Sequence, residues 1–178
     1  MELHGDRILL RRFTDADAPA VRRACDDPES ARFLPFLPSP YTEADARAYI
    51  AFAKRSWADG SRLLFAIVDA RTEELLGSID VRTGEVGSVG YWIGPEARGH
   101  GIATEALRVL ARWAIREHGI ERLELTTHPE NLASQRVAEK AGFHREGVLR
   151  SHLRFREGRR DTVMFSLLPS DLDELQEP

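Results

Sequence analysis

The residue types best suited to chemistry lie in one short, glycine-containing loop. The loop reads Arg98-Gly99-His100-Gly101-Ile102-Ala103-Thr104, and it joins a predicted strand to a predicted helix. A helix N-terminus exposes unpaired backbone N–H groups and the positive end of the helix dipole, so small residues before it let a phosphate approach closely. Arg98 could add a charge-assisted contact to that phosphate. Taken alone, the loop fits phosphate binding and an ordinary helix-capping glycine turn about equally well.

Two other phosphate-binding motifs do not match this loop. A Walker A loop requires Gly-Lys followed by Ser or Thr, which is missing here. A dinucleotide fingerprint requires a third small residue where Thr104 stands and an acidic residue at the end of the next strand, and Glu121, Glu124 and Glu130 fit that place poorly. The predicted antiparallel strands before the loop also differ from a βαβ unit. Both motifs are therefore disfavoured.

The bulk composition is typical of one globular domain. We expect a single domain over residues 1–178, with a core over about 8–168 and an acidic tail over 169–178, because 42% hydrophobic residues can form a normal core. The 25 basic and 29 acidic residues give a net charge of −4, which offers no long-range attraction to DNA or to an anionic membrane. Cys25 is the one cysteine and no long apolar run or signal peptide is visible, so we expect a cytoplasmic protein without disulfides.

The histidines show no spacing that is typical of a metal site. No His-x-x-x-His pair occurs, and no histidine adjoins a cysteine, so we expect no metal cofactor. The six histidines are His4, His100, His118, His128, His144 and His152.

The elements that must position the loop follow from the hydrophobic periodicity. The predicted order β, α, α, β, β, β, α, β, α, β, β favours an α/β or α+β fold, with a mixed sheet flanked by helices. Helices are predicted after the capping residues Thr14 and Thr42 and over residues 104–118 and 133–141. The predicted strands cover residues 8–12, 64–68, 75–81, 86–93, 123–127, 143–149 and 162–167.

Two connections have a distinct composition. Residues 33–40 contain three prolines and are predicted to form an ordered apolar loop of the kind that often borders a site. The last two predicted strands are joined by a longer connection that contains Glu157 and Gly158.

Two motifs, in this order, resemble those of the GNAT acetyltransferases. Arg98-x-x-Gly101-x-Ala103 is similar to the Gln/Arg-x-x-Gly-x-Gly/Ala signature of that family. The wider run from Gly90-Tyr91-Trp92-Ile93 to Thr104-Glu105-Ala106-Leu107 resembles its ribosomal-protein N-acetyltransferase branch. A second similar block is Asn131-Leu132-Ala133-Ser134 followed by Val137-Ala138-Glu139-Lys140-Ala141-Gly142-Phe143. The likeness spans nearly the whole chain, and two ordered motifs are more specific than one glycine loop.

The resemblance implies a mostly antiparallel central sheet with a splayed strand pair at an acetyl-CoA site, and CoA as a product. It implies that the pantetheine lies along the strand ending at Trp92, Ile93 and Gly94, with the pyrophosphate against residues 98–104. It also implies cofactor contacts by Asn131 and Ser134, and backbone N–H groups in the splay that polarise the thioester carbonyl. From the residues alone, Tyr91 and Trp92 are more typical of core or rim aromatics, and Asn131 of a helix cap.

An N-acetyltransferase needs a base for the amine and benefits from a proton donor for the departing sulfur. The resemblance implies that Ser134 is the donor, and helix capping after Asn131 is the alternative function of this serine. The base is left open, because Ser88 and the neighbours Leu153 and Arg154 stand where relatives carry glutamate.

Several groups could replace the missing base. A water chain, a carboxylate of the substrate or a displaced residue such as Glu85 would each suffice. Glu105 lies in the first turn of a predicted helix, where a carboxylate favours the dipole and needs no catalytic function.

The acceptor and the partners are not specified by these residues. The resemblance implies a primary amine, in a small molecule or at a protein N-terminus, with residues 33–41 and the helix after Thr42 as one substrate wall. A catalytically silent CoA-binding regulator and an RNA-binding module stay open as alternatives, and a homodimer is compatible with the sequence. The RNA-binding alternative depends on Arg145, Arg150, Arg154, Arg156, Arg159 and Arg160.

Overall fold

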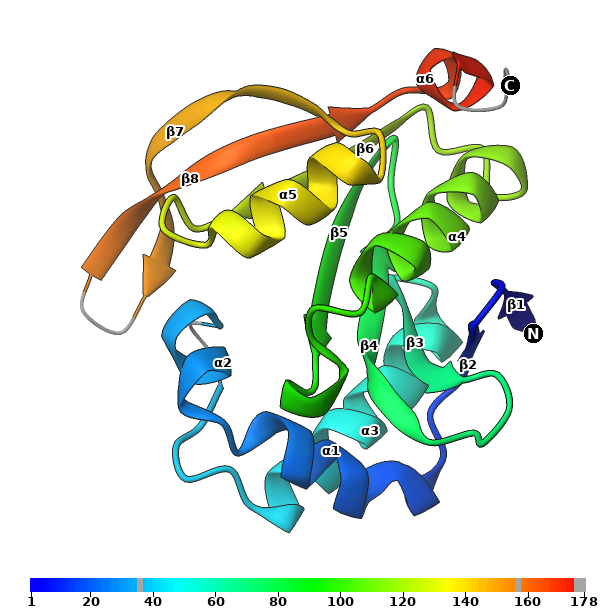
Figure 1. Ribbon diagram of the computed structural model, residues 1–178, viewed down its shortest axis with the longest axis vertical. Helices are drawn as coiled ribbons and strands as arrows, with labels where there is room; N and C mark the ends of the chain where they lie inside the picture. Colours follow the sequence, from blue (N-terminus) through cyan, green and yellow to red (C-terminus); the bar gives the residue numbers. More distant parts are fainter. Residues whose placement is uncertain (35–36, 156–157, 175–178) are drawn as a thin grey trace.

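The computed structural model describes residues 1–34, 37–155 and 158–174. These residues form one eight-stranded sheet with the strand order β1-β2-β3-β4-β5-β6-β8-β7 (Figure 1). Neighbouring strands are antiparallel except for β5 and β6, which are parallel. The strands are β1 (Glu2–His4), β2 (Ile8–Arg11), β3 (Arg62–Asp69), β4 (Leu75–Arg82), β5 (Val86–Ile93), β6 (Arg122–Thr127), β7 (His144–Phe155) and β8 (Gly158–Leu167).

Helices cover both faces of the sheet. α1 and α3 pack on the face that carries Leu64 and Ala66 of β3, whereas α4 packs on the opposite face against Phe65 and Ile67. This alternation follows from the two-residue period of a strand. The predicted mixed sheet, mostly antiparallel and flanked by helices, is therefore confirmed. The helices are α1 (Ala18–Cys25), α2 (Pro28–Phe33), α3 (Glu43–Asp59), α4 (Ile102–Arg116), α5 (Leu132–Lys140) and α6 (Pro169–Glu174), with short 3-10 turns η1 (Asp15–Asp17) and η2 (Pro95–Ala97).

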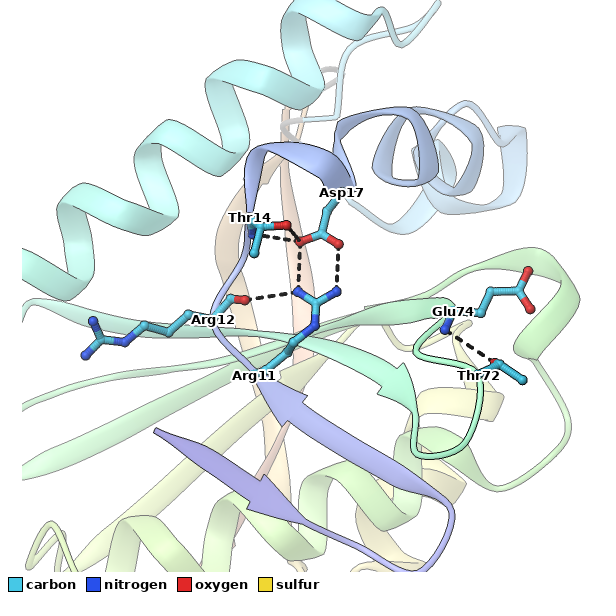
Figure 2. A network of polar contacts seen from close by, with 6 residues as sticks. All are labelled: Arg11, Arg12, Thr14, Asp17, Thr72 and Glu74. Carbon is cyan, nitrogen blue, oxygen red and sulfur yellow. Dashed lines mark hydrogen bonds and ion pairs between the residues drawn. The ribbon is translucent and has the colours of Figure 1, made fainter.

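A polar network at the end of β2 fixes the start of the first helical segment (Figure 2). The Asp17 carboxylate accepts a hydrogen bond from the Thr14 N–H at 2.7 Å, and the Arg11 guanidinium donates to both carboxylate oxygens at 2.8 and 2.9 Å. Thr14 and Asp17 form the capping box that the sequence predicts, and Thr42 and Asp45 form another at the start of α3. Both predicted helix starts are confirmed.

The last two strands are longer than the sequence predicts. β7 continues to Phe155 and β8 begins at Gly158, so the prediction of a long connection containing Gly158 is wrong, while Glu157 lies outside the described residues. Most of β7 is exposed or half-buried, so its two faces carry polar residues and show no apolar alternation from which a strand could be read.

The sequence reading also missed short elements. α2 has six residues, none of them buried, and therefore lacks an apolar period. Phe33, which the prediction assigned to the apolar loop, ends α2, while Pro35 and Phe36 lie outside the described residues. The predicted acidic tail begins with α6, whose Leu172 is buried against the core. No helix within the described parts of the chain is long and apolar enough to cross a membrane.

The two parallel strands separate before they end. β5 and β6 pair from Val86 opposite Arg122 to Val89 opposite Leu125. Beyond this point residues 90–93 of β5 stay paired with β4, whereas Thr126 and Thr127 of β6 pair with β8. The predicted splayed strand pair is therefore present, and from residue 90 onward the edge of β5 that faces β6 has no strand partner.

Candidate functional site

A cavity of about 370 Å³ lies at the end of β5, bordered by the start of α4, by α5 and by α2. Most residues that the sequence analysis assigned to cofactor binding line it, and two do not. Gly94 and His100 border other surface depressions. The predicted residues that line the cavity are Trp92, Ile93, Arg98, Gly99, Gly101, Ile102, Ala103, Thr104, Asn131 and Ser134.

The turn before α4 has a backbone conformation that favours glycine. Gly99 has φ 78°, and Gly101, the N-cap of α4, has φ 79°. Residues with a Cβ adopt such positive φ values only at a cost in energy. A Cβ at Gly99 would meet no heavy atom within 4 Å, so the surface of the turn is open. Because the first N–H groups of α4 have no intrahelical acceptor, this open turn suits a phosphate group.

Arg98 connects the turn to α2. Its guanidinium donates hydrogen bonds to Asp27 at 2.5 Å, to Glu29 at 2.8 Å and to the Ser30 hydroxyl at 2.8 Å, and its Nε donates to the carbonyl oxygen of Ile93 at 3.2 Å. The guanidinium is thus surrounded by protein acceptors. A phosphate contact by Arg98 stays a prediction, and the observed contacts give this side chain a function in holding α2 against the cavity.

Asp27 is the N-cap of α2, and the same contacts determine its pKa. Its carboxylate accepts a hydrogen bond from the Ser30 N–H at 2.8 Å as the N-cap of the helix. Burial raises the pKa of Asp27, but the hydrogen bonds from Arg98 and Ser30 outweigh burial and lower the pKa below its ordinary value of 3.8. Asp27 is therefore a stable anion that balances the charge of Arg98.

Gly94 and His100 have other contacts. The Gly94 N–H donates to the carbonyl oxygen of Leu76 at 2.9 Å, which continues the pairing with β4. The His100 carbonyl accepts from Arg7 at 2.9 Å, and its side chain is exposed outside the cavity. Glu105 accepts from the Arg7 N–H at 2.8 Å and pairs with the Arg7 guanidinium at 3.1 Å. These bonds give Glu105 a structural partner in addition to the helix dipole.

Ser134 lies on the cavity wall with a partner that the sequence analysis did not assign to the site. Its hydroxyl is 2.8 Å from the Tyr91 hydroxyl, and either group can donate. Asn131 caps α5 by accepting from the Ser134 N–H at 3.0 Å, so the capping contact uses the backbone of Ser134 and leaves its hydroxyl for Tyr91. Burial raises the pKa of Tyr91 to about 12, although the bond to Ser134 opposes this shift. The pair is therefore neutral near pH 7.

The residue type of Tyr91 predicts a core or rim aromatic. Tyr91 does pack against the core, and it also lines the cavity. The position of Tyr91 on β5 could have indicated a place in the site. Successive strand residues face opposite sides of the sheet, so a residue next to the strand separation must face one side of the splay. The partner is 43 residues away in the sequence, so the contact itself could not be read from spacing.

The positions where relatives carry glutamate hold no acid in this chain. Ser88 is exposed on β5, and Leu153 and Arg154 lie on β7. Glu85 precedes β5, five residues from Gly90, which corresponds to roughly 16 Å at the rise of a strand. Glu85 is therefore too far from the point of strand separation to act there directly.

α2 also contacts the far side of the splay. The ring of Phe33 lies 5.7 Å from that of His128, which follows β6, and His128 lies 5.6 Å from Phe155 at the end of β7. Arg32 and Glu130 form an ion pair at 2.7 Å across the same gap. Phe33 and its neighbour in the chain line the cavity, so part of the predicted substrate wall borders the site.

The remaining expectations concern metals and nucleic acid. Within the described ranges, no group of three or more His, Cys, Asp or Glu residues could hold a metal ion, and the expectation of a metal-free protein stays a prediction. Among the arginines near the last strands, Arg159 donates to the carbonyl oxygens of Ser151 at 2.6 Å and His152 at 2.8 Å. Arg156 lies outside the described residues. These contacts give Arg159 a structural function in the hairpin.

Comparison with known proteins identifies similar chains. Residues 7–144 match the family model described as an acetyltransferase (GNAT) domain. An uncharacterized N-acetyltransferase, p20 of Bacillus licheniformis, is 28% identical over 93% of this chain and 95% of its own length. Two solved structures have the same fold over most of their length. A GNAT-family acetyltransferase from Bacillus anthracis has a TM-score of 0.84 and 25% identity, covering 94% of this chain and 98% of that one. RimL, a ribosomal alpha-N-protein acetyltransferase in complex with coenzyme A, has a TM-score of 0.86 and 18% identity, covering 97% and 100%.

Proposed function

Because the chain belongs to the GNAT acetyltransferase family and is an acyltransferase, we propose that it transfers an acetyl group from acetyl-CoA to a primary amine by direct attack. One observation carries this proposal: the cavity at the start of α4 meets the splay between β5 and β6, and the Ser134 hydroxyl borders it. The proposed phosphate-binding turn, the unpaired part of β5 and the proposed proton donor thus border one cavity. Acetyl-CoA supplies a thioester that an amine can attack.

Backbone groups make most of the proposed contacts with the cofactor. The N–H groups of the first turn of α4 hold the pyrophosphate, and Gly99 and Gly101 keep side chains out of its way. The free edge of β5 from residue 90 to 93 bonds the pantetheine amides and the thioester carbonyl. Arg98 acts by positioning α2 beside them.

Ser134 is the proposed donor of a proton to the departing sulfur. Tyr91 keeps the Ser134 hydroxyl oriented and can replace the proton that the serine gives up, since the two hydroxyls are 2.8 Å apart. The raised pKa of Tyr91, about 12, supports a neutral tyrosine that retains its proton through the pH range of the reaction.

The acceptor is proposed to be the α-amine of a protein N-terminus, with a small primary amine as the alternative. RimL acts on a ribosomal protein, and its fold is the same over nearly the whole chain. The aromatic side chains of Phe33, His128 and Phe155 lie beside the splay and could contact the first residues of a peptide. The net charge of −4 also suits a cationic acceptor.

Calorimetric titration of acetyl-CoA tests the cofactor site. Gly101→Glu places a bulky anion at the N-cap of α4, and we expect at least about a hundredfold loss of affinity. Gly119→Glu is the matched control for the backbone conformation, because Gly119 also has a positive φ, 66°, but follows the opposite end of α4. Wild-type protein that binds no acetyl-CoA would overturn the proposal.

Thiol release tests the reaction itself. A peptide with a free N-terminus, the same peptide with a blocked N-terminus and a set of small amines are compared at equal concentration. Faster release with the free peptide supports a protein acceptor. Acetyl-CoA binding without acceptor-dependent release for any amine would favour the alternative of a silent CoA-binding regulator.

A further inference from the structure

Two carboxylates flank β5 on the face of the sheet opposite Tyr91. Asp80 of β4 pairs with Gly90, and Glu124 of β6 pairs with Ser88. Residues paired across neighbouring strands share a face, and adjacent residues on one strand face opposite sides. Asp80 and Glu124 therefore lie on the side of α1 and α3, whereas Tyr91 faces α5 and Ser134.

Asp80 lies beside the point where the strands separate. Gly90 is the first residue of β5 without a partner on β6, because the pairing ends at Val89 and Leu125. A Cβ at Gly90 would lie 3.2 Å from Asp80 Oδ1. The absence of a side chain at this position thus leaves the carboxylate next to the free edge that is proposed to bind the thioester.

The two oxygens of Asp80 have different surroundings. Oδ2 accepts a hydrogen bond from Arg62 Nε at 2.5 Å, and within the described residues Oδ1 accepts none. The side chain of Asp80 is 10% exposed and that of Arg62 29% exposed. One oxygen is therefore held in place while the other is left for a ligand.

The groups around Asp80 make it a stronger base than an ordinary aspartate. Burial raises its pKa to about 6, although Arg62 and then Arg82 oppose this shift. Tyr49 of α3 also interacts with Asp80, and burial raises the pKa of Tyr49 to about 12, so it stays neutral. The paired residues of β5 on this face, Ser88, Gly90 and Trp92, carry no charge. A carboxylate with a pKa near 6 is ionised at neutral pH and can accept a proton efficiently.

We propose that Asp80 is the general base that accepts a proton from the acceptor amine through Oδ1, and that Arg62 positions it. This inference rests on the proposed acetyl transfer. The ammonium group gives one proton to Asp80, which passes it to solvent, and the neutral nitrogen forms the C–N bond as the C–S bond breaks. The second proton lost by nitrogen balances the proton that the sulfur gains on the opposite side of β5.

Glu124 is the matched control for this function. It lies on the same face of the neighbouring strand, but it is bound to Arg122 at 2.8 Å, and Arg122 also holds Glu146 at 2.6 Å. Glu124 pairs with Ser88, two residues before Gly90, in the part of β5 that is still joined to β6. It is therefore farther from the free strand edge than Asp80.

The test is thiol release by Asp80→Asn and Glu124→Gln with saturating acceptor, together with the acetyl-CoA affinity of each variant. We expect kcat of Asp80→Asn to fall by about 10² to 10³-fold with acetyl-CoA affinity within about threefold of wild type, and kcat of Glu124→Gln to stay within about threefold. An active wild type with an unimpaired Asp80→Asn variant, or a larger loss for Glu124→Gln, overturns the assignment of Asp80. A wild type without any thiol release instead overturns the proposed function.

Two further readouts separate a base from a purely structural ion pair. The kcat of wild type should rise with pH through an apparent pKa near 6, and Arg62→Gln should move this rise to higher pH, because the variant removes the charge that lowers the pKa of Asp80. An acceptor amine that is already neutral at the assay pH should be acetylated by Asp80→Asn with a much smaller loss. An unchanged pH profile in Arg62→Gln, or an equal loss with both kinds of amine, would contradict a base function.

Discussion

The two faces of the sheet next to β5 have different kinds of polar pair. On the side of α5, the Tyr91 and Ser134 hydroxyls are 2.8 Å apart and uncharged. On the side of α1 and α3, Asp80 and Arg62 form a charged pair at 2.5 Å. A hydroxyl pair can pass a proton to a developing thiolate, whereas a carboxylate can take one from an ammonium group. The sheet therefore separates the proposed proton donor on α5 from the proposed proton acceptor on β4.

Ser134→Ala gives the largest expected effect on the α5 side. We expect kcat to fall by about 10²-fold with little change in acetyl-CoA affinity, because the sulfur loses its proposed proton donor. Single-turnover thiol release measures this loss. Ser88→Ala is the control, because Ser88 lies on β5 and faces the opposite side of the sheet, and it should change kcat by less than about twofold. Equal losses in the two variants would contradict the division between the faces.

Tyr91→Phe should have a smaller effect of the same kind. We expect kcat to fall by about tenfold, since Ser134 keeps its hydroxyl but loses the partner 2.8 Å away. If the two hydroxyls act as a unit, the double variant with Ser134→Ala should be no slower than Ser134→Ala alone. Multiplying losses in this double-mutant cycle would show that Tyr91 acts independently of Ser134.

The structure explains why only part of this arrangement could be predicted from the sequence. The turn before α4 is local, so its glycines and the following helix are visible as a continuous run of residues. The splayed strand pair was predicted from the resemblance to the GNAT family, and the observed strand register supports it. The pair of Tyr91 and Ser134 joins residues 43 apart, and Arg62 and Asp80 are 18 apart. Such contacts depend on the strand order and register, which hydrophobic periodicity does not specify.

The Arg98 prediction failed to include its partners for a related reason. α2 has no buried residue and was not recognised as a helix, so Asp27 and Glu29 could not be placed beside the turn. An arginine before a phosphate-binding turn predicts a direct phosphate contact, and that contact stays a prediction. In the structure the Arg98 guanidinium also has two carboxylates and a serine hydroxyl as partners.

Arg98→Ala tests how the charge of Arg98 contributes to cofactor binding on the cavity side of β5. If Arg98 positions α2, acetyl-CoA affinity should fall by about fivefold and kcat should change little, because the proposed proton donor is untouched. Asp27→Asn should then weaken binding to a similar degree, since it loosens the same contact. If Arg98 binds the pyrophosphate directly, Asp27→Asn should leave the affinity unchanged or improve it. Calorimetric titration of both variants distinguishes the two outcomes.

Asp17→Asn should have the smallest effect on catalysis, and it shows what an Arg–Asp pair does when it supports only the fold. Asp17 resembles Asp80 in being largely buried and bound to an arginine, but it lies at the start of the first helical segment (Figure 2). We expect an unfolding free energy lower by about 2 kcal/mol, because the half-buried Arg11 loses its charged partner, and an unchanged kcat and pH profile. Urea unfolding together with thiol release measures both.

The pH dependence of stability should also distinguish the two aspartates. Burial raises the pKa of Asp17, but the bonds from Arg11 and Thr14 outweigh it and lower the pKa below its ordinary value of 3.8. Its stabilisation is therefore complete above that value and is lost as pH falls through the lower folded pKa. The pKa of Asp80 is raised to about 6, so its ionisation lowers stability as pH rises from about 4 to 6. Urea unfolding of wild type, Asp17→Asn and Asp80→Asn from pH 3 to 7 should give difference curves of opposite sign, and curves of the same sign would remove the contrast between a supporting pair and a pair in the site.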